Sequence, residues 1–213
     1  FYKEKSDKQD LRFTFGIPAL KLGRAAFVCK KIVMTGLVGL SVSVAAQAAG
    51  VTIAGNALPI NGQVVAGSAT ISTPSANTLT VQQTSNRAVI NWQSFDVGAN
   101  ATVNFQQPNG GVIVNRVVGS GSASQINGAM NANGTVVVVN SAGVVIGKGA
   151  QVNTGSLVAS TLDMNNAKFM NGEMNFVGGQ NSTSKVINQG TVTATADNGF
   201  IALLAPEVRN EGY

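Results

Sequence analysis

The sequence contains no histidine and a single cysteine, Cys29, among its 213 residues. Without histidine, neither a Ser-His-Asp triad nor a Cys-His pair can form, and zinc loses its usual nitrogen ligand. One cysteine also cannot form a disulfide within the chain. Acidic residues are few, with three Asp and three Glu after Gly50, and they lie far apart in the sequence. The composition therefore argues against an enzyme, and we expect no metal and no cofactor.

Charge is also scarce, at 11% of the chain against about 25% in an average soluble domain. The net charge of +5 lies entirely before Gly50, where eight basic residues outnumber three acidic ones; six of each sign follow. A nucleic-acid groove needs clustered cations, and the later basic residues are scattered, so we expect no nucleic-acid partner. Abundant Gly, Asn, Val, Ser and Thr favour short strands and turns over helices.

The basic residues mark a leader. Lys30 and Lys31 precede an apolar run of thirteen residues, Ile32 to Val44, and then a small-residue segment with Ala46 and Ala48 in an Ala-x-Ala arrangement. A membrane-spanning helix needs about twenty apolar residues. A signal peptide cleaved after Ala48 therefore explains the pattern better than a membrane anchor or a buried core helix.

We accordingly expect two parts: an extended leader over residues 1–48, disordered or helical, and a mature domain over residues 49–213. Residues 1–29 either lengthen the leader, as in very large exported proteins, or come from an upstream start that is never translated. Because the chain begins without Met and stops after a repeat-like phrase, we interpret it as a fragment whose domain is truncated at its C-terminus. Cys29 falls in the leader, which leaves the mature domain free of cysteine.

From Val51 onward, short apolar segments recur every eight to twelve residues between Asn, Gly and Ser turns, which predicts an all-β fold. The expected strands are 78–83, 88–92, 101–106, 111–117, 135–140, 143–146, 156–159, 185–187, 191–195 and 200–204.

A repeated phrase distinguishes a solenoid from a sandwich. Val186 to Gly190 (VINQG) returns 22 residues later as Val208 to Gly212 (VRNEG), the length of one coil of a parallel β-helix, with a weaker echo at Val152 to Gly155. The Asn residues would stack as a ladder, and the Gly residues would supply a positive φ. Ordinary β-turns containing N-x-G are the competing interpretation. We predict a right-handed parallel β-helix.

Three further segments fit such a solenoid. The run Thr135 to Asn140 is apolar on both strand faces, which predicts a deeply buried strand. The first thirty mature residues, interrupted by Pro59 and Pro74, are expected to cap the exposed end of the helix. Leu162 to Phe176 breaks the strand rhythm, and we interpret it as a loop excursion packed on the flank, with a Met-lined binding site as the alternative.

Linked phrases then carry a family resemblance. The chain has INWQSFDVG over 90–98, VIVNRV over 112–117 and SQING over 124–128, followed by matching segments through 136–147, 155–163 and 210–212. Over about 160 residues it resembles the two-partner secretion domain, also called the haemagglutination activity domain, of filamentous haemagglutinin and the high-molecular-weight adhesins. The family-motif positions are Asn91, Trp92, Phe95, Asn115, Arg116, Gln125 and Gly128.

One family phrase is altered. Where the family usually carries N-P-N-G-I, this chain has Asn140, Ser141, Ala142 and Gly143 before Val144. A proline would fix this corner, so its loss would loosen the turn or weaken partner recognition. A second family phrase, N-P-N-L, is only faintly suggested at 107–110. By resemblance, Asn140 to Gly143 form the candidate corner for folding or transporter recognition.

The resemblance implies a secretion-targeting domain at the head of a large exported adhesin, secreted or held at the cell surface. It also implies a partner: a TpsB-type outer-membrane transporter with periplasmic modules, after whose passage the domain seeds the longer β-helix. Adhesion, haem capture or toxin delivery, and any host-cell or bacterial surface receptors, would belong to downstream sequence. The alternatives are a passenger of a single-chain autotransporter, which a C-terminal barrel on the same chain would indicate, and a polysaccharide-active β-helix enzyme.

Overall fold

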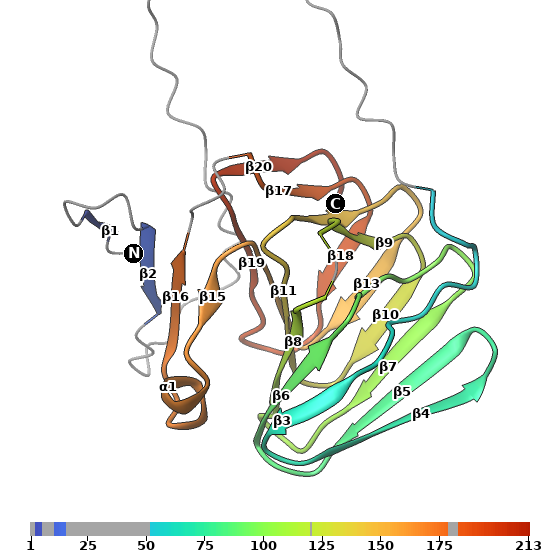
Figure 1. Ribbon diagram of the computed structural model, residues 1–213, viewed down its shortest axis with the longest axis horizontal. Helices are drawn as coiled ribbons and strands as arrows, with labels where there is room; N and C mark the ends of the chain where they lie inside the picture. Colours follow the sequence, from blue (N-terminus) through green and yellow to red (C-terminus); the bar gives the residue numbers. More distant parts are fainter. Residues whose placement is uncertain (1–2, 6–10, 16–51, 120, 179–182) are drawn as a thin grey trace, which may run out of the picture.

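The computed structural model describes residues 3–5, 11–15, 52–119, 121–178 and 183–213. Strands dominate these residues, and the helix among them, α1 (Asn166–Met170), is five residues long. The chain winds repeatedly through three sheets whose neighbouring strands are mostly parallel (Figure 1). The all-β solenoid predicted from the turn spacing is confirmed.

The three sheets form the walls of the solenoid. Sheet I consists, in spatial order, of β18 (Thr191–Ala194), β13 (Gln151–Thr154), β10 (Ala129–Ala132), β7 (Thr102–Gln106), β5 (Thr78–Gln83) and β4 (Ala69–Ser75). Sheet II consists of β19 (Ile201–Leu204), β14 (Ser156–Ser160), β11 (Thr135–Val139), β8 (Val112–Val117), β6 (Arg87–Trp92) and β3 (Gln63–Ala66). Sheet III consists of β20 (Glu207–Asn210), β17 (Lys185–Asn188), β12 (Val144–Ile146) and β9 (Ser124–Ile126).

Each coil contributes one strand to each sheet. The second coil contains β7, β8 and β9, and the third contains β10, β11 and β12. The fourth contains β13, β14 and β17, and the fifth contains β18, β19 and β20. The first coil has β5 and β6, and a single parallel bridge from Val97 to Ile126 replaces its third strand. Like residues therefore stack between coils, as where Val136 pairs with both Ile113 and Leu157.

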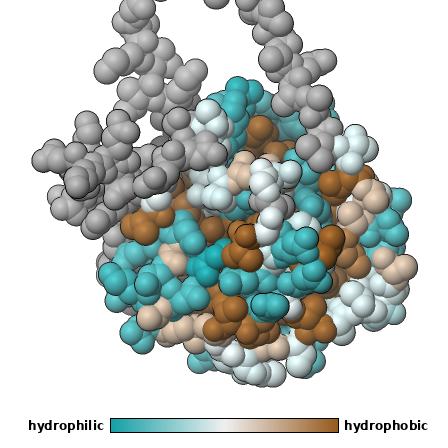
Figure 2. All heavy atoms as spheres, in the orientation of Figure 1, coloured by the Kyte–Doolittle hydropathy of each residue, from teal (hydrophilic) through white to brown (hydrophobic). Residues whose placement is uncertain are grey.

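The interior of the solenoid is the main hydrophobic core. Val136 and Val138 of β11 point into it, whereas Val137 and Val139 belong to a second apolar cluster outside sheet II. The four valines are buried, which confirms the prediction of a strand covered on both faces. On the outer surface, the view in Figure 2 shows hydrophobic residues in separate groups among hydrophilic ones.

The second cluster is covered by an excursion from the fourth coil. Between β14 and β17 the chain forms β15 (Asp163–Met164), α1 and β16 (Met174–Gly178), which place Phe169 and Phe176, both fully buried, against the outer face of sheet II. Packing on the flank was predicted, but the segment is more regular than the expected loop. The helix begins because the Asn165 side chain accepts a hydrogen bond from the Lys168 backbone at 3.1 Å.

Two leader segments are extended, so the expectation of a disordered or helical leader is wrong for them. Strand β2 (Leu11–Phe15) pairs antiparallel with β16, and β1 (Lys3–Lys5) pairs with β2. The sequence LRFTF alternates apolar and polar residues, which suits a strand, and the edge of β16 offers it backbone partners. The apolar run and the cleavage positions Ala46 and Ala48 lie outside the described residues.

The predicted cap is present at the N-terminal end. Strand β3 pairs antiparallel with β6, and β4 pairs antiparallel with β5, so both sheets end on a reversed strand. Pro74 lies within β4, where the pairing register shifts between Ser72 and Ser75. A proline at such a bulge on an edge strand costs no ladder hydrogen bond. The segment blunts an edge that would otherwise invite aggregation.

The 22-residue repeat is a true stacking repeat. Val186 pairs with Val208, and the Asn188 side chain donates a hydrogen bond to that of Asn210 at 2.8 Å, so the asparagine ladder is confirmed. The glycines serve another purpose than predicted. Gly190 and Gly212 are not among the residues with positive φ, but a Cβ on Gly212 would collide with the Gly190 carbonyl. The echo at 152–155 is wrong as a repeat, because its strand lies in sheet I.

Replacing Val137 by Asp should prevent stable folding. The carboxylate would be buried between sheet II and the excursion without a partner, at a cost of about 4 kcal/mol or more. Urea denaturation followed by circular dichroism measures the loss, and Thr193→Asp, at an exposed position of β18, is the matched control. Equal stability of the two variants would show that Val137 is not a core residue.

Candidate functional site

The predicted corner joins β11 to β12, and Asn140 is its centre. The Asn140 side chain is 1% exposed and donates to the Ser122 carbonyl and to Ser124 Oγ, both at 3.0 Å, in the second coil. Its Oδ1 accepts from the Ala142 backbone N–H at 2.9 Å, which closes the turn. The hydrogen-bonding capacity of this side chain is therefore directed inward, toward the fold.

The same corner touches the fourth coil at two points. The Asn140 backbone N–H donates to the Ser160 carbonyl at 3.0 Å, where β14 ends and the excursion departs. Ser184 Oγ donates to the Ser141 carbonyl at 2.6 Å, just before β17 resumes the coil. The corner therefore binds both ends of the excursion. We call Asn140 to Gly143, with these contacts, the excursion corner.

Gly143 has a φ of +129°, a backbone conformation that other residues resist. Its N–H donates to the Asn140 carbonyl, and its carbonyl accepts from the Ser124 N–H, both at 3.0 Å. A Cβ here would lie 2.9 Å from the Lys185 carbonyl. Glycine is thus required both by conformation and by the closeness of the fourth coil.

Ser141 and Ala142 differ from their neighbours in exposure. Ser141 is exposed and Ala142 is partly exposed, whereas Asn140 and Gly143 are buried. The Asn140 side chain closes the turn that a proline would otherwise restrict. The residues that depart from the family phrase are therefore the ones that a partner reaches from outside.

Three family-motif positions pack inside the solenoid. Trp92 Nε1 donates to Asn115 Oδ1 at 3.0 Å, and Asn115 in turn donates to the Val137 carbonyl at 3.5 Å. Phe95 meets the Trp92 ring edge-on, with centroids 5.8 Å apart and planes at 74°. These side chains are almost completely buried, so they specify the first coils and offer no surface to a ligand.

Arg116 and Asn91 hold the other side of the excursion. The Arg116 guanidinium lies 2.8 Å from Asp163 Oδ1 and donates to the Met164 carbonyl, also at 2.8 Å. A longer contact of 3.4 Å reaches Asn91 Oδ1. Because the arginine side chain is only 12% exposed, these bonds are less screened than those of a surface ion pair. They fasten β15 to sheet II.

Gln125 and Gly128 lie where the first and second coils meet. The Gln125 backbone N–H donates to Asp96 Oδ1 at 2.8 Å, and a Cβ on Gly128 would collide with the Gly98 carbonyl. The motif positions thus divide between the first coils and the excursion, and they do not gather at the excursion corner. Their shared contribution is the shape of the domain.

Two charged contacts were not predicted from the sequence. The Arg87 guanidinium lies over the Phe169 ring, 5.1 Å from its centroid, and burial lowers the pKa of Arg87. In sheet III, the hydrogen bond from Lys185 holds the pKa of the Glu207 carboxyl below its ordinary value, with a smaller contribution from Arg209. An arginine opening an apolar strand was the one available signal for the first contact.

Within the described ranges, no three His, Cys, Asp or Glu side chains gather as metal ligands, and no helix is long and apolar enough to cross a membrane. The excursion corner and the motif positions offer hydrogen bonds, close packing and one exposed turn. Such an arrangement supports folding and recognition by another protein.

Comparison with known proteins identifies the class. The family model of the TPS secretion domain matches residues 43–213, and the chain belongs to this family of two-partner secretion domains. The crystal structure of the HMW1 secretion domain from Haemophilus influenzae has a TM-score of 0.63 and 31% sequence identity, and the match covers 72% of this chain and 41% of that one.

Two curated relatives place the chain within larger exported proteins. A heme/hemopexin-binding protein of Haemophilus influenzae is 44% identical over 107 residues, which is 50% of this chain and 11% of that protein. The protein of the same name from the Rd strain is 38% identical over 160 residues, or 73% of this chain and 18% of that protein. The chain thus spans between a tenth and a fifth of these relatives. It is the secretion domain of an exported protein, and its partner is a TpsB outer-membrane transporter.

Replacing Asn140 by Ala should destabilise the domain by about 2 to 3 kcal/mol, because the Ala142 N–H and the buried Ser124 hydroxyl lose their partner. Chemical denaturation would measure this loss. Asn198→Ala, in an exposed turn, serves as the control and should change stability by less than about 0.5 kcal/mol. A corner variant as stable as the control would refute the central role of Asn140.

Proposed function

We propose that residues 49–213 carry the export determinant of a large surface protein, and that residues 1–48 are its leader, cleaved after Ala48. The observation that carries the first proposal is the excursion corner, where buried and exposed residues alternate within a single turn. Asn140 and Gly143 serve folding, because their contacts are internal. Ser141 and Ala142 serve recognition by the periplasmic modules of the transporter, because they are accessible.

This division assigns a role to the departure from the family phrase. A transporter that reads the corner meets a serine hydroxyl and a methyl group where related domains offer proline and asparagine. The turn itself keeps its closure through the Ala142 N–H bond to Asn140. The substitution therefore changes partner preference more than stability.

The ligand named for the curated relatives is a separate matter. Those proteins are named for binding heme and hemopexin, yet this chain matches at most 18% of their length. We propose that this part serves export, and that adhesion, ligand capture and contact with host-cell or bacterial receptors belong to other parts of the whole protein. The acidic side chains of Asp96, Asp163 and Glu207 are already engaged in structural bonds, which supports a role without catalysis.

Export assays separate the two halves of the corner. Asn140→Ala combined with Gly143→Val should reduce secretion several-fold beside the transporter, because about 2 kcal/mol of lost stability changes the amount of folded product several-fold. Thr135→Ser, a conservative change at the start of β11, is the control. The measurement is the quantity of secreted fragment relative to the periplasmic pool.

Ser141→Arg with Ala142→Arg should also reduce secretion, but without loss of stability in denaturation. Asn198→Arg, in another exposed turn, should leave both secretion and stability unchanged. Normal secretion of both corner variants would exclude the corner as an export determinant. Loss of secretion only in the Asn140 and Gly143 variant would restrict its role to folding.

A further inference from the structure

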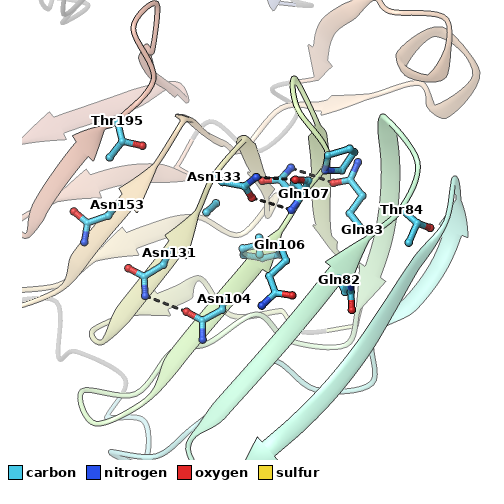
Figure 3. Close-up of a pocket in the computed structure, with 13 residues that line it drawn as sticks. Gln82, Gln83, Thr84, Asn104, Gln106, Gln107, Asn131, Asn133, Asn153 and Thr195 are labelled. Atoms are coloured by element: carbon cyan, nitrogen blue, oxygen red, sulfur yellow. Dashed lines mark hydrogen bonds between the residues drawn. The ribbon is translucent and has the colours of Figure 1, made fainter.

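A shallow groove with a volume of about 940 Å³ lies on the outer face of sheet I, away from the excursion corner. Its walls come from the C-terminal ends of β5, β7, β10 and β13, and Figure 3 shows their side chains rising from neighbouring strands. Neither the export proposal nor the motif positions use this surface.

The lining of the groove is unusual in being uncharged and rich in amides. Four Gln and four Asn are among its thirteen residues, with two Thr, and none of the thirteen is charged. The aromatic residue that contributes to it, Phe105, is 3% exposed and belongs to the interior core. The groove therefore offers hydrogen bonds, but it offers neither a net charge nor a deep apolar pocket.

One side of the groove is held rigid by its own hydrogen bonds. Gln107 donates through Nε2 to Gln83 Oε1 at 3.1 Å and accepts through Oε1 from the Gly134 N–H at 3.2 Å. Asn133 forms two bonds with the Gln107 backbone, at 2.8 and 2.6 Å. A ligand at this side would not have to order these amides, so the entropic cost of binding is reduced.

The centre of the groove is a row of asparagines with unused capacity. Asn104, Asn131 and Asn153 are in register on successive coils, and Asn131 donates to Asn104 at 3.1 Å (Figure 3). Among the described residues, the amides of Gln82, Gln106 and Asn153 hydrogen-bond to no other side chain or backbone group. The row presents donors and acceptors at the spacing of adjacent strands, about 4.8 Å.

We propose that this groove binds a neutral glycan, with successive sugar residues lying along successive coils. A carboxamide both donates and accepts, as does a sugar hydroxyl, so the two pair without regard to polarity. Nucleic acids and acidic glycans would find no cation here, and a peptide would find no pocket for an apolar anchor. Because no exposed aromatic ring is available for stacking, each sugar binds weakly and affinity grows with chain length.

The test uses the complete 213-residue chain, labelled with ¹⁵N, and linear neutral oligomers of glucose, mannose and galactose from disaccharide to octasaccharide. We expect at least one series to shift the side-chain amide signals of Gln82, Gln106 and Asn153, with a dissociation constant that falls as the oligomer lengthens. Gln106→Ala with Asn153→Ala should weaken binding about tenfold while leaving the unfolding midpoint unchanged. Asn175→Ala with Gln189→Ala, which removes two amides elsewhere, should leave binding intact.

Absence of shifts with all three neutral series would overturn the proposal. So would equal binding by the groove variant, or tighter binding of a polygalacturonate oligomer or of an uncharged Thr-Asn peptide of comparable length. The secretion assay is independent of this result, because Gln106 and Asn153 lie outside the excursion corner. Failure of glycan binding would therefore leave the export proposal standing, and the reverse also holds.

Discussion

In-register pairing between successive coils is the constraint on which the rest of this structure depends. Each coil must return the chain to a point beside its predecessor, whatever its length. From Ala129 to Gln151 the chain takes 22 residues, by subtraction of the paired positions, and from Gln151 to Thr191 it takes 40. The register survives this difference because the extra residues leave and rejoin the coil at one place. That place is the excursion corner.

The corner explains how a buried asparagine and an exposed turn serve one domain. Asn140 joins the second, third and fourth coils, and Gly143 allows the fourth coil to approach closely. Arg116 fastens the far side of the excursion, and Arg87 lies over Phe169 beneath it. With the excursion held in place, sheet II is covered on both faces and its valine run is removed from water. An export signal placed on this turn would be fully formed only once the coils are stacked.

The sequence predicted the elements whose signals are local. The segment 78–83 coincides with β5, the valine run was correctly expected to be buried on both faces, and the phrase around Asn188 recurs in stacking register around Asn210. Short strands such as β9 and β10 were missed, because three or four residues with few branched side chains resemble turns. The strand over residues 11–15 was missed because its partner, β16, lies far away in sequence.

The candidate site was only partly readable for the same reason. The corner was found through its resemblance to a family phrase, yet nothing in the local sequence indicates that Asn140 would contact Ser122, Ser124 and Ser160. The motif positions were grouped as one set, but most of them are core or clasp residues. The amide groove was not found, since its residues are spread over more than seventy positions and only the stacking of the coils brings them together.

Native-state hydrogen exchange on the Asn140→Ala variant tests most directly whether the corner holds the excursion in the coil. If it does, amide protection should fall together at the end of β14, in β16 and at the start of β17, while β5 and β7 at the other end keep theirs. A loss of protection confined to residues 140–143, with the excursion as protected as before, would contradict this account.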